Sequence, residues 1–145
     1  MELTSSEFLH GGPVPPRHTC EGEDVSQSLR WSDIPVGAHS LALIVEDPDA
    51  PGRTFTHWLA WGIRAETPGL GPGKAVPLEG RNDFGAVGYR GPCPPVGHRP
   101  HRYVFRLHAL DGEPAAAAGG SRRALEASLE GHVVETAELV GTYAR

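Results

Sequence analysis

The segment HSLALIVEDPDAPGRTFTHWLAWGI, residues 39–63, predicts two neighbouring β-strands and the turn between them. HSLALIVED (39–47) is an apolar run of strand length with β-branched residues, and the turn formers DPDAP follow it. TFTHWLAWGI (54–63) and HRYVFRLHAL (101–110) are two further runs of strand length that contain aromatic residues. Because the 19 glycines and 14 prolines lie between such runs, we expect a mainly β fold, with an antiparallel sandwich or a pair of sheets.

The C-terminal part, residues 115–145, has a different pattern that predicts helices. Ser121 is placed as an N-cap, Leu125 and Leu129 lie one helical turn apart, and Gly131 would end this helix. We expect a second helix over residues 133–140. The fold class expected from the whole sequence is therefore mainly β with a short helical end.

Length and charge limit the classes of protein that this sequence can encode. A chain of 145 residues matches one domain, residues 1–145, with enough length for its own core. The formal net charge is -5 and no cluster of basic residues is present, so a nucleic-acid partner is not expected. No apolar run has the length of a membrane span, and residues 1–8 lack the pattern of a secretory signal. We therefore expect a cytoplasmic protein.

Cys20 and Cys93 are the two cysteines, and they form no C-x-x-C pair. Their spacing gives neither a zinc motif nor a thioredoxin-type redox motif. Two free thiols in a reducing compartment are the expected state, and a disulfide between the two cysteines stays open as the alternative.

Two of the expected strands begin with polar residues and continue with apolar ones, at alternate positions. Side chains at such positions share one face of a strand, so each run would carry a histidine at the edge of a hydrophobic core. The two predicted faces are His57, Leu59, Trp61 and Ile63, and His101, Tyr103, Phe105 and Leu107.

A carboxylate on a stiff turn can reach the same edge. Asp47 lies at the end of the first strand, and Pro48 and Pro51 restrict the backbone around it. Imidazoles, a tyrosine hydroxyl and amides of the loop 91–93 would supply hydrogen-bond donors for phosphate or carboxylate oxygens. The pattern predicts a small pocket for anions, in which Asp47 orients a histidine or accepts a proton from the ligand.

DPDAP, FTHW and GYRGPCPPVGHRPHRY, taken with TCEGEDVSQSLRWSDIP near the start, resemble the phosphatidylethanolamine-binding protein family, in its bacterial and archaeal Raf-kinase-inhibitor-like branch. The likeness covers nearly the whole chain, although Gln27 and Ser28 stand where this branch commonly has two prolines. It implies a large central antiparallel sheet with a smaller sheet and short C-terminal helices. It also implies an anion pocket. By motif position the ligand-binding residues would be Asp47, Pro51, His57, Gly91, His101 and Tyr103.

The resemblance implies a binding protein with no catalytic residues, no cofactor and no metal. Its ligand would be a phosphate, a phospho-group or a lipid head group. A further implied partner is a protein kinase or protease that it inhibits. Related bacterial members also suggest a homodimer as one oligomeric state. Two alternatives remain: a hydrolase-like enzyme in which Cys93 acts with His57 or His101, and a metal site of two histidines and a carboxylate.

Overall fold

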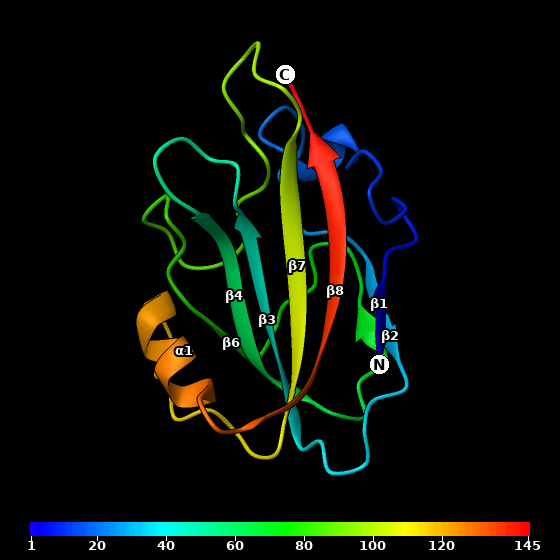
Figure 1. Cartoon of the computed structure of the whole chain (residues 1–145), viewed down its shortest axis with the longest axis vertical. Coiled ribbons are helices and arrows are strands. Elements are labelled where there is room, and N and C mark those ends of the chain that lie inside the picture. The colour runs from blue at the N-terminus through cyan, green and yellow to red at the C-terminus, as the bar shows by residue number, and fades with distance from the viewer.

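Two antiparallel sheets, a 3-10 helix and one α-helix make up the chain, and the computed structural model describes all 145 residues (Figure 1). The central sheet has the strand order β6-β4-β3-β7-β8, and the smaller sheet has the order β1-β2-β5. The strands are β1 (Glu2–Thr4), β2 (Leu29–Ser32), β3 (Ser40–Asp47), β4 (Phe55–Arg64), β5 (Gly69–Leu70), β6 (Leu78–Glu79), β7 (His101–Leu110) and β8 (Val133–Tyr143). The helices are the 3-10 helix Pro16–His18 and α1 (Arg122–Leu129).

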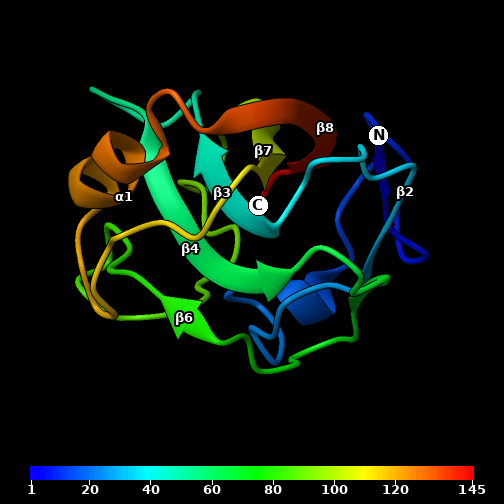
Figure 2. The ribbon, with the colours of Figure 1, turned by 90° about the horizontal axis from the view of Figure 1, so that it is seen from below.

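The central sheet separates two hydrophobic cores. The larger core lies between this sheet and the small sheet, with residues such as Leu29 and Trp31 of β2 packed toward Phe105. The smaller core lies under α1, where Leu125 and Leu129 meet the opposite face of the sheet. Figure 2 shows α1 and the small sheet on opposite sides of the central strands. The molecule is thus a three-layer arrangement of sheet, sheet and helix.

β3 is the central strand, and all eight of its residues are buried. Leu41, Leu43 and Val45 face the larger core, while Ala42 and Ile44 face the smaller one. Since both faces are covered, the strand has a continuous apolar run in place of an alternating pattern. The three strands expected at 39–47, 54–63 and 101–110 are confirmed as β3, β4 and β7 within one residue.

The expected helix after Ser121 is confirmed as α1. The Ser121 hydroxyl accepts a hydrogen bond from the Ala124 N–H at 3.1 Å, so it caps the helix as predicted. No helix of the chain combines the length and the apolar character that crossing a bilayer requires.

The second helix expected over residues 133–140 is wrong, because this segment is β8. It pairs with β7 along its whole length, with Leu139 opposite Phe105 and Gly141 opposite Tyr103. Ala137 and Leu139 are buried at alternate positions, which is the period of a strand. The chain therefore has one α-helix in its C-terminal part, where two were expected.

The face predicted for β4 is also wrong in part. Leu59 and Trp61 pack together in the core under α1, but Ile63 lies in the opposite core. The pairing of β4 with β3 shifts register twice, and Gly62, at the first shift, has φ of +72°. The second shift lies at His57 and turns its ring to the face opposite Leu59, because a bulge redirects the side chain beside it.

Candidate functional site

A cavity of about 220 Å³ lies at one end of the central sheet, where β3 ends and β7 begins. In Figure 1 this end is at the top, beside the C-terminus. Five of the six predicted site residues line it: Asp47, Pro51, His57, His101 and Tyr103. Most of the remaining wall is apolar and comes from Ala50, Phe55, Phe84, Pro94 and Pro95.

Asp47 and His101 form a buried pair in the wall of this cavity. Asp47 Oδ2 lies 2.6 Å from His101 Nδ1, and each side chain is only 5% exposed. Asp47 Oδ1 also accepts the Asp49 N–H at 2.8 Å, which fixes the carboxylate on its own turn. The carboxylate is an acceptor, so Nδ1 carries the hydrogen and the orientation of the His101 ring is set.

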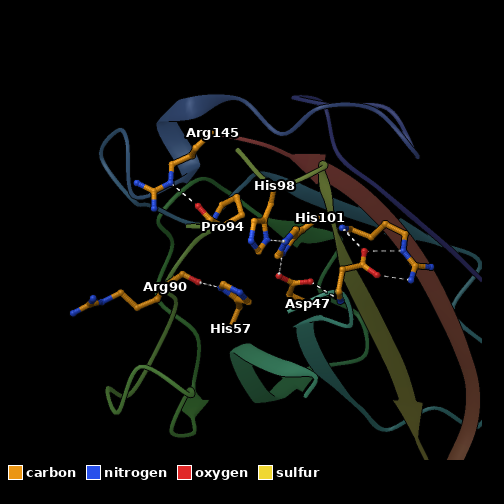
Figure 3. Close-up of polar contacts among 9 residues, drawn as sticks. Asp47, His57, Arg90, Pro94, His98, His101 and Arg145 are labelled. Atoms are coloured by element: carbon orange, nitrogen blue, oxygen red, sulfur yellow. Dashed lines mark hydrogen bonds and ion pairs between the residues drawn. The ribbon is translucent and has the colours of Figure 1, made fainter. Parts of the chain in front are cut away.

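His57 faces the cavity from the bulge in β4. Its Nδ1 lies 2.7 Å from the Arg90 carbonyl oxygen (Figure 3). Its ring packs edge-on against Tyr103, with the ring centroids 5.3 Å apart. Burial of the ring lowers the pKa of His57, and the hydrogen bond to the Arg90 carbonyl only partly opposes this effect. His57 is therefore a neutral imidazole over a wider pH range than an ordinary histidine.

Tyr103 is buried on the same face as His101, as its alternate position in β7 predicts. Burial raises the pKa of its phenol, and the nearby Asp47 carboxylate raises it further. The group thus stays protonated and keeps a hydroxyl hydrogen to donate.

His98 is a residue of this region that the sequence analysis did not single out. Its Nδ1 lies 3.3 Å from His101 Nε2, so the two imidazoles and Asp47 form a continuous row (Figure 3). His98 is exposed and lies in a shallow hollow next to the main cavity. The spacing H-x-x-H in GHRPHRY is the signal that could have indicated this pair.

Gly91 is the predicted site residue that does not line the cavity. Its N–H donates to Asp24 Oδ1 at 2.9 Å, and a Cβ at this position would lie 2.0 Å from the His18 carbonyl oxygen. Glycine is thus required for close packing behind the wall, and the Gly91 amide is not free for a ligand. Pro92 has no N–H, so Cys93, which does line the cavity, carries the remaining amide of this loop.

Cys20 and Cys93 form a disulfide with Cα atoms 5.4 Å apart, where two free thiols were expected. A separation of 73 residues gave no sequence signal for this pairing. The bond ties the proline-rich wall of the cavity to the N-terminal segment. It also removes the free thiol that the enzyme alternative assigned to Cys93.

The structure contains no cluster of side chains that matches the metal alternative. No group of three or more histidine, cysteine, aspartate or glutamate side chains is placed to hold a metal ion. His57, His101 and Asp47 surround the cavity, but both Nδ1 atoms already donate, to the Arg90 carbonyl and to Asp47.

Comparisons with known proteins agree with this architecture. The family model described as phosphatidylethanolamine-binding protein matches residues 4–144. A UPF0098 protein of Pyrococcus abyssi is 45% identical over 153 residues, which cover 100% of this chain and 86% of that protein. A UPF0098 protein of Methanothermobacter thermautotrophicus is 43% identical over 154 residues, covering 100% of this chain and 99% of the relative.

Two crystal structures share the fold. One is a phosphatidylethanolamine-binding protein homologue, CT736, from Chlamydia trachomatis, with a TM-score of 0.94, 37% identity, and coverage of 99% of this chain and 97% of the other. The second is Escherichia coli YbcL, described as a new member of the mammalian family, with a TM-score of 0.92, 35% identity, and coverage of 99% and 98%.

Proposed function

Because this chain belongs to the phosphatidylethanolamine-binding protein family, we propose that it binds a small anionic or phosphate-bearing ligand in the cavity and catalyses no reaction on it. The observation that carries the proposal is the convergence of His57, His101 and Tyr103 on one concave wall. His57 comes from β4, whereas His101 and Tyr103 both come from β7. All three side chains carry polar hydrogens or can acquire them.

The donors of the site are neutral or become charged only on protonation. Tyr103 donates its hydroxyl. A doubly protonated His101 can donate from Nε2 while Nδ1 stays on Asp47, once the ligand replaces the exposed His98 ring, whose Nδ1 lies 3.3 Å from this nitrogen. Cys93 lines the cavity, and we expect its backbone N–H to add one donor there. Asp47 acts in this proposal as a positioning residue that fixes the ring of His101.

Titration of the protein with inorganic phosphate tests the proposal. We expect the side-chain NMR signals of His57 and His101 to shift with a saturable dependence on phosphate. His101→Ala and Tyr103→Phe should each weaken binding by about tenfold or more, because each removes a hydrogen bond to a charged ligand. His39→Ala is the matched control, since His39 precedes β3 at the opposite end of the sheet and is exposed. Equal affinities for all four proteins would contradict the pocket assignment.

The proposal extends to a protein partner and to a homodimer. The partner would be a kinase or protease that the chain inhibits, and sedimentation of the purified protein tests the dimer. The cytoplasmic location expected from the sequence stays a prediction, and the disulfide weighs against it because such bonds persist mainly in oxidising compartments. Fractionation of cells after the thiols have been trapped would test the location and the bond together.

A further inference from the structure

We propose that the cavity selects oxyanions that carry a hydrogen on one oxygen, such as hydrogen phosphate or the protonated form of a phosphate monoester. This inference rests on the proposed anion pocket and narrows its ligand class. It depends on which nitrogen of His57 holds the ring hydrogen.

The Arg90 carbonyl determines the tautomer of His57. A carbonyl oxygen can only accept, and it lies 2.7 Å from His57 Nδ1, so the ring hydrogen is on Nδ1. In a neutral imidazole the other nitrogen, Nε2, then has a lone pair and no hydrogen. The Arg90 side chain does not alter this arrangement, because it is exposed and extends away from His57 (Figure 3).

Nε2 of His57 is open to the cavity. It has no hydrogen-bond partner within the chain, and it is not among the buried polar atoms that are sealed from solvent. An oxygen atom of a ligand that approaches this nitrogen therefore meets an acceptor. If that oxygen carries no hydrogen, two lone pairs face each other and no hydrogen bond forms.

The lining of the cavity carries no fixed positive charge to offset such a mismatch; Arg145, which donates to the Pro94 carbonyl at 2.7 Å, acts on Tyr103 from outside the lining. No lysine or arginine lines the cavity, and the one ionisable acid in its wall is Asp47. The permanent donor among the lining side chains is the Tyr103 hydroxyl, whose pKa burial raises. Binding must then follow the match of donors and acceptors more closely than the net charge of the ligand.

A ligand that matches this wall presents a negative oxygen to the Tyr103 hydroxyl and a hydroxyl of its own to His57 Nε2. In inorganic phosphate, one phosphorus atom carries both a negative oxygen and a hydroxyl. A phosphate monoester has both below its second pKa, which is about 6. Sulfate near neutral pH and a phosphodiester have no such hydrogen. A diester lipid head group is by this reasoning a poor ligand for the site.

Calorimetric titration of the whole protein near pH 6 with four probes tests the inference: inorganic phosphate, methyl phosphate, dimethyl phosphate and sulfate. We expect phosphate and methyl phosphate to bind at least about tenfold more tightly than dimethyl phosphate and sulfate, as expected when a buried acceptor is left without a donor. Charge alone predicts a different order, with sulfate the tightest. Methyl phosphate controls for the bulk of the methyl groups in the diester.

His57→Gln supplies a second test. A glutamine amide can turn either its oxygen or its NH₂ group toward the ligand, so sulfate should gain affinity and the ratio between phosphate and sulfate should fall toward one. His39→Gln is the control and should keep the ratio of the parent protein. If His57→Gln does not fold, the four probes on the parent protein still decide.

Binding of all four probes within about threefold of each other would overturn the selectivity and leave the anion pocket intact. Binding of none of them would overturn the proposed function, and the selectivity with it. Binding of phosphate and methyl phosphate alone supports both.

Discussion

The carboxylate of Asp49 receives three hydrogen bonds from Arg102, one from its backbone N–H at 2.9 Å and two from its guanidinium at 2.8 and 3.0 Å. This contact joins the turn after β3 to the first residues of β7. The hydrogen bonds from the Arg102 side chain lower the pKa of Asp49 to about 2. Since Asp47 lies two residues before Asp49 and His101 directly precedes Arg102, the exposed pair holds the buried pair in register.

Asp49→Asn should weaken phosphate binding more than it weakens the fold. An exposed ion pair contributes about 0.2–1 kcal/mol to stability, so the free energy of unfolding in urea should change by no more than that. The dissociation constant for phosphate should rise by about three- to tenfold, because the orientation of His101 is less well fixed. Glu66→Gln is the matched control, since Glu66 pairs with Arg64 in an exposed ion pair at the other end of β4. The same change in affinity for both variants would contradict the positioning role.

The disulfide should contribute a large part of the stability. Closing a loop across 73 residues is expected to stabilise the fold by about 4 kcal/mol. Reductant should therefore lower the urea midpoint of the parent protein. The Cys20→Ser/Cys93→Ser variant should show a similarly lowered midpoint, and reductant should not change it. The native protein should show no thiol that reacts with an alkylating reagent before reduction. A reactive Cys93 thiol in the native protein would reopen the enzyme alternative.

Local pattern was sufficient to predict the strands whose side chains decide the site. β7 was predicted with its observed bounds, and its alternation placed His101 and Tyr103 on one face correctly. β8 was not predicted, because its first four residues are exposed and present no alternating apolar face. Pairing with β7 determines the structure of this segment, and pairing between strands is a tertiary effect.

Most of the residues predicted for the site line the cavity, but the sequence did not predict how all of them are placed. The face of His57 was wrong, since a bulge changes the alternation and depends on the register with β3. The role of Gly91 differs for a similar reason, because its close approach to the His18 carbonyl joins segments far apart in the sequence. Cys20 and Cys93 were expected to be free thiols, because the sequence does not show how close two cysteines lie in the folded chain.

Glu46 connects three elements from a buried position, and its removal should be costly. Its carboxylate bonds to Arg122 of α1 at 2.5 Å and to Arg106 of β7 at 3.1 Å. Burial of the carboxyl opposes ionisation, but the two arginines outweigh it and lower the pKa of Glu46. Glu46→Gln should reduce the free energy of unfolding by about 1–3 kcal/mol, as measured in urea at neutral pH.

Because the pKa of Glu46 is lowered in the folded protein, the stabilisation that its ion pairs contribute depends on pH. A carboxyl whose folded pKa lies below its unfolded pKa stabilises the fold above the unfolded value, and the contribution is lost as the pH falls through the folded value. The stability gap between the parent protein and Glu46→Gln should thus narrow on acidification. Glu138→Gln is the control, because Glu138 pairs with Arg106 from an exposed position. A gap that does not depend on pH would contradict the ionic role of Glu46.

Selectivity between phosphate and sulfate should depend on the protonation of His57. When the ring gains a second hydrogen, Nε2 becomes a donor and can bind an oxygen without a hydrogen, so sulfate should bind at low pH. Because burial lowers the pKa of His57, this change should occur below the usual titration range of histidine. The titratable and charged groups around the ring are Asp24, Asp47, Asp83, His101 and Tyr103.

The acids among these neighbours favour the protonated ring, and burial opposes them with the larger effect. Asp83→Asn should therefore lower the pKa of His57 further and move the onset of sulfate binding to still lower pH. NMR titration of the His57 ring and sulfate titrations at a series of pH values would measure the two quantities on the same protein. Sulfate binding that follows the protonation of His101 while His57 stays neutral would assign the selectivity to His101.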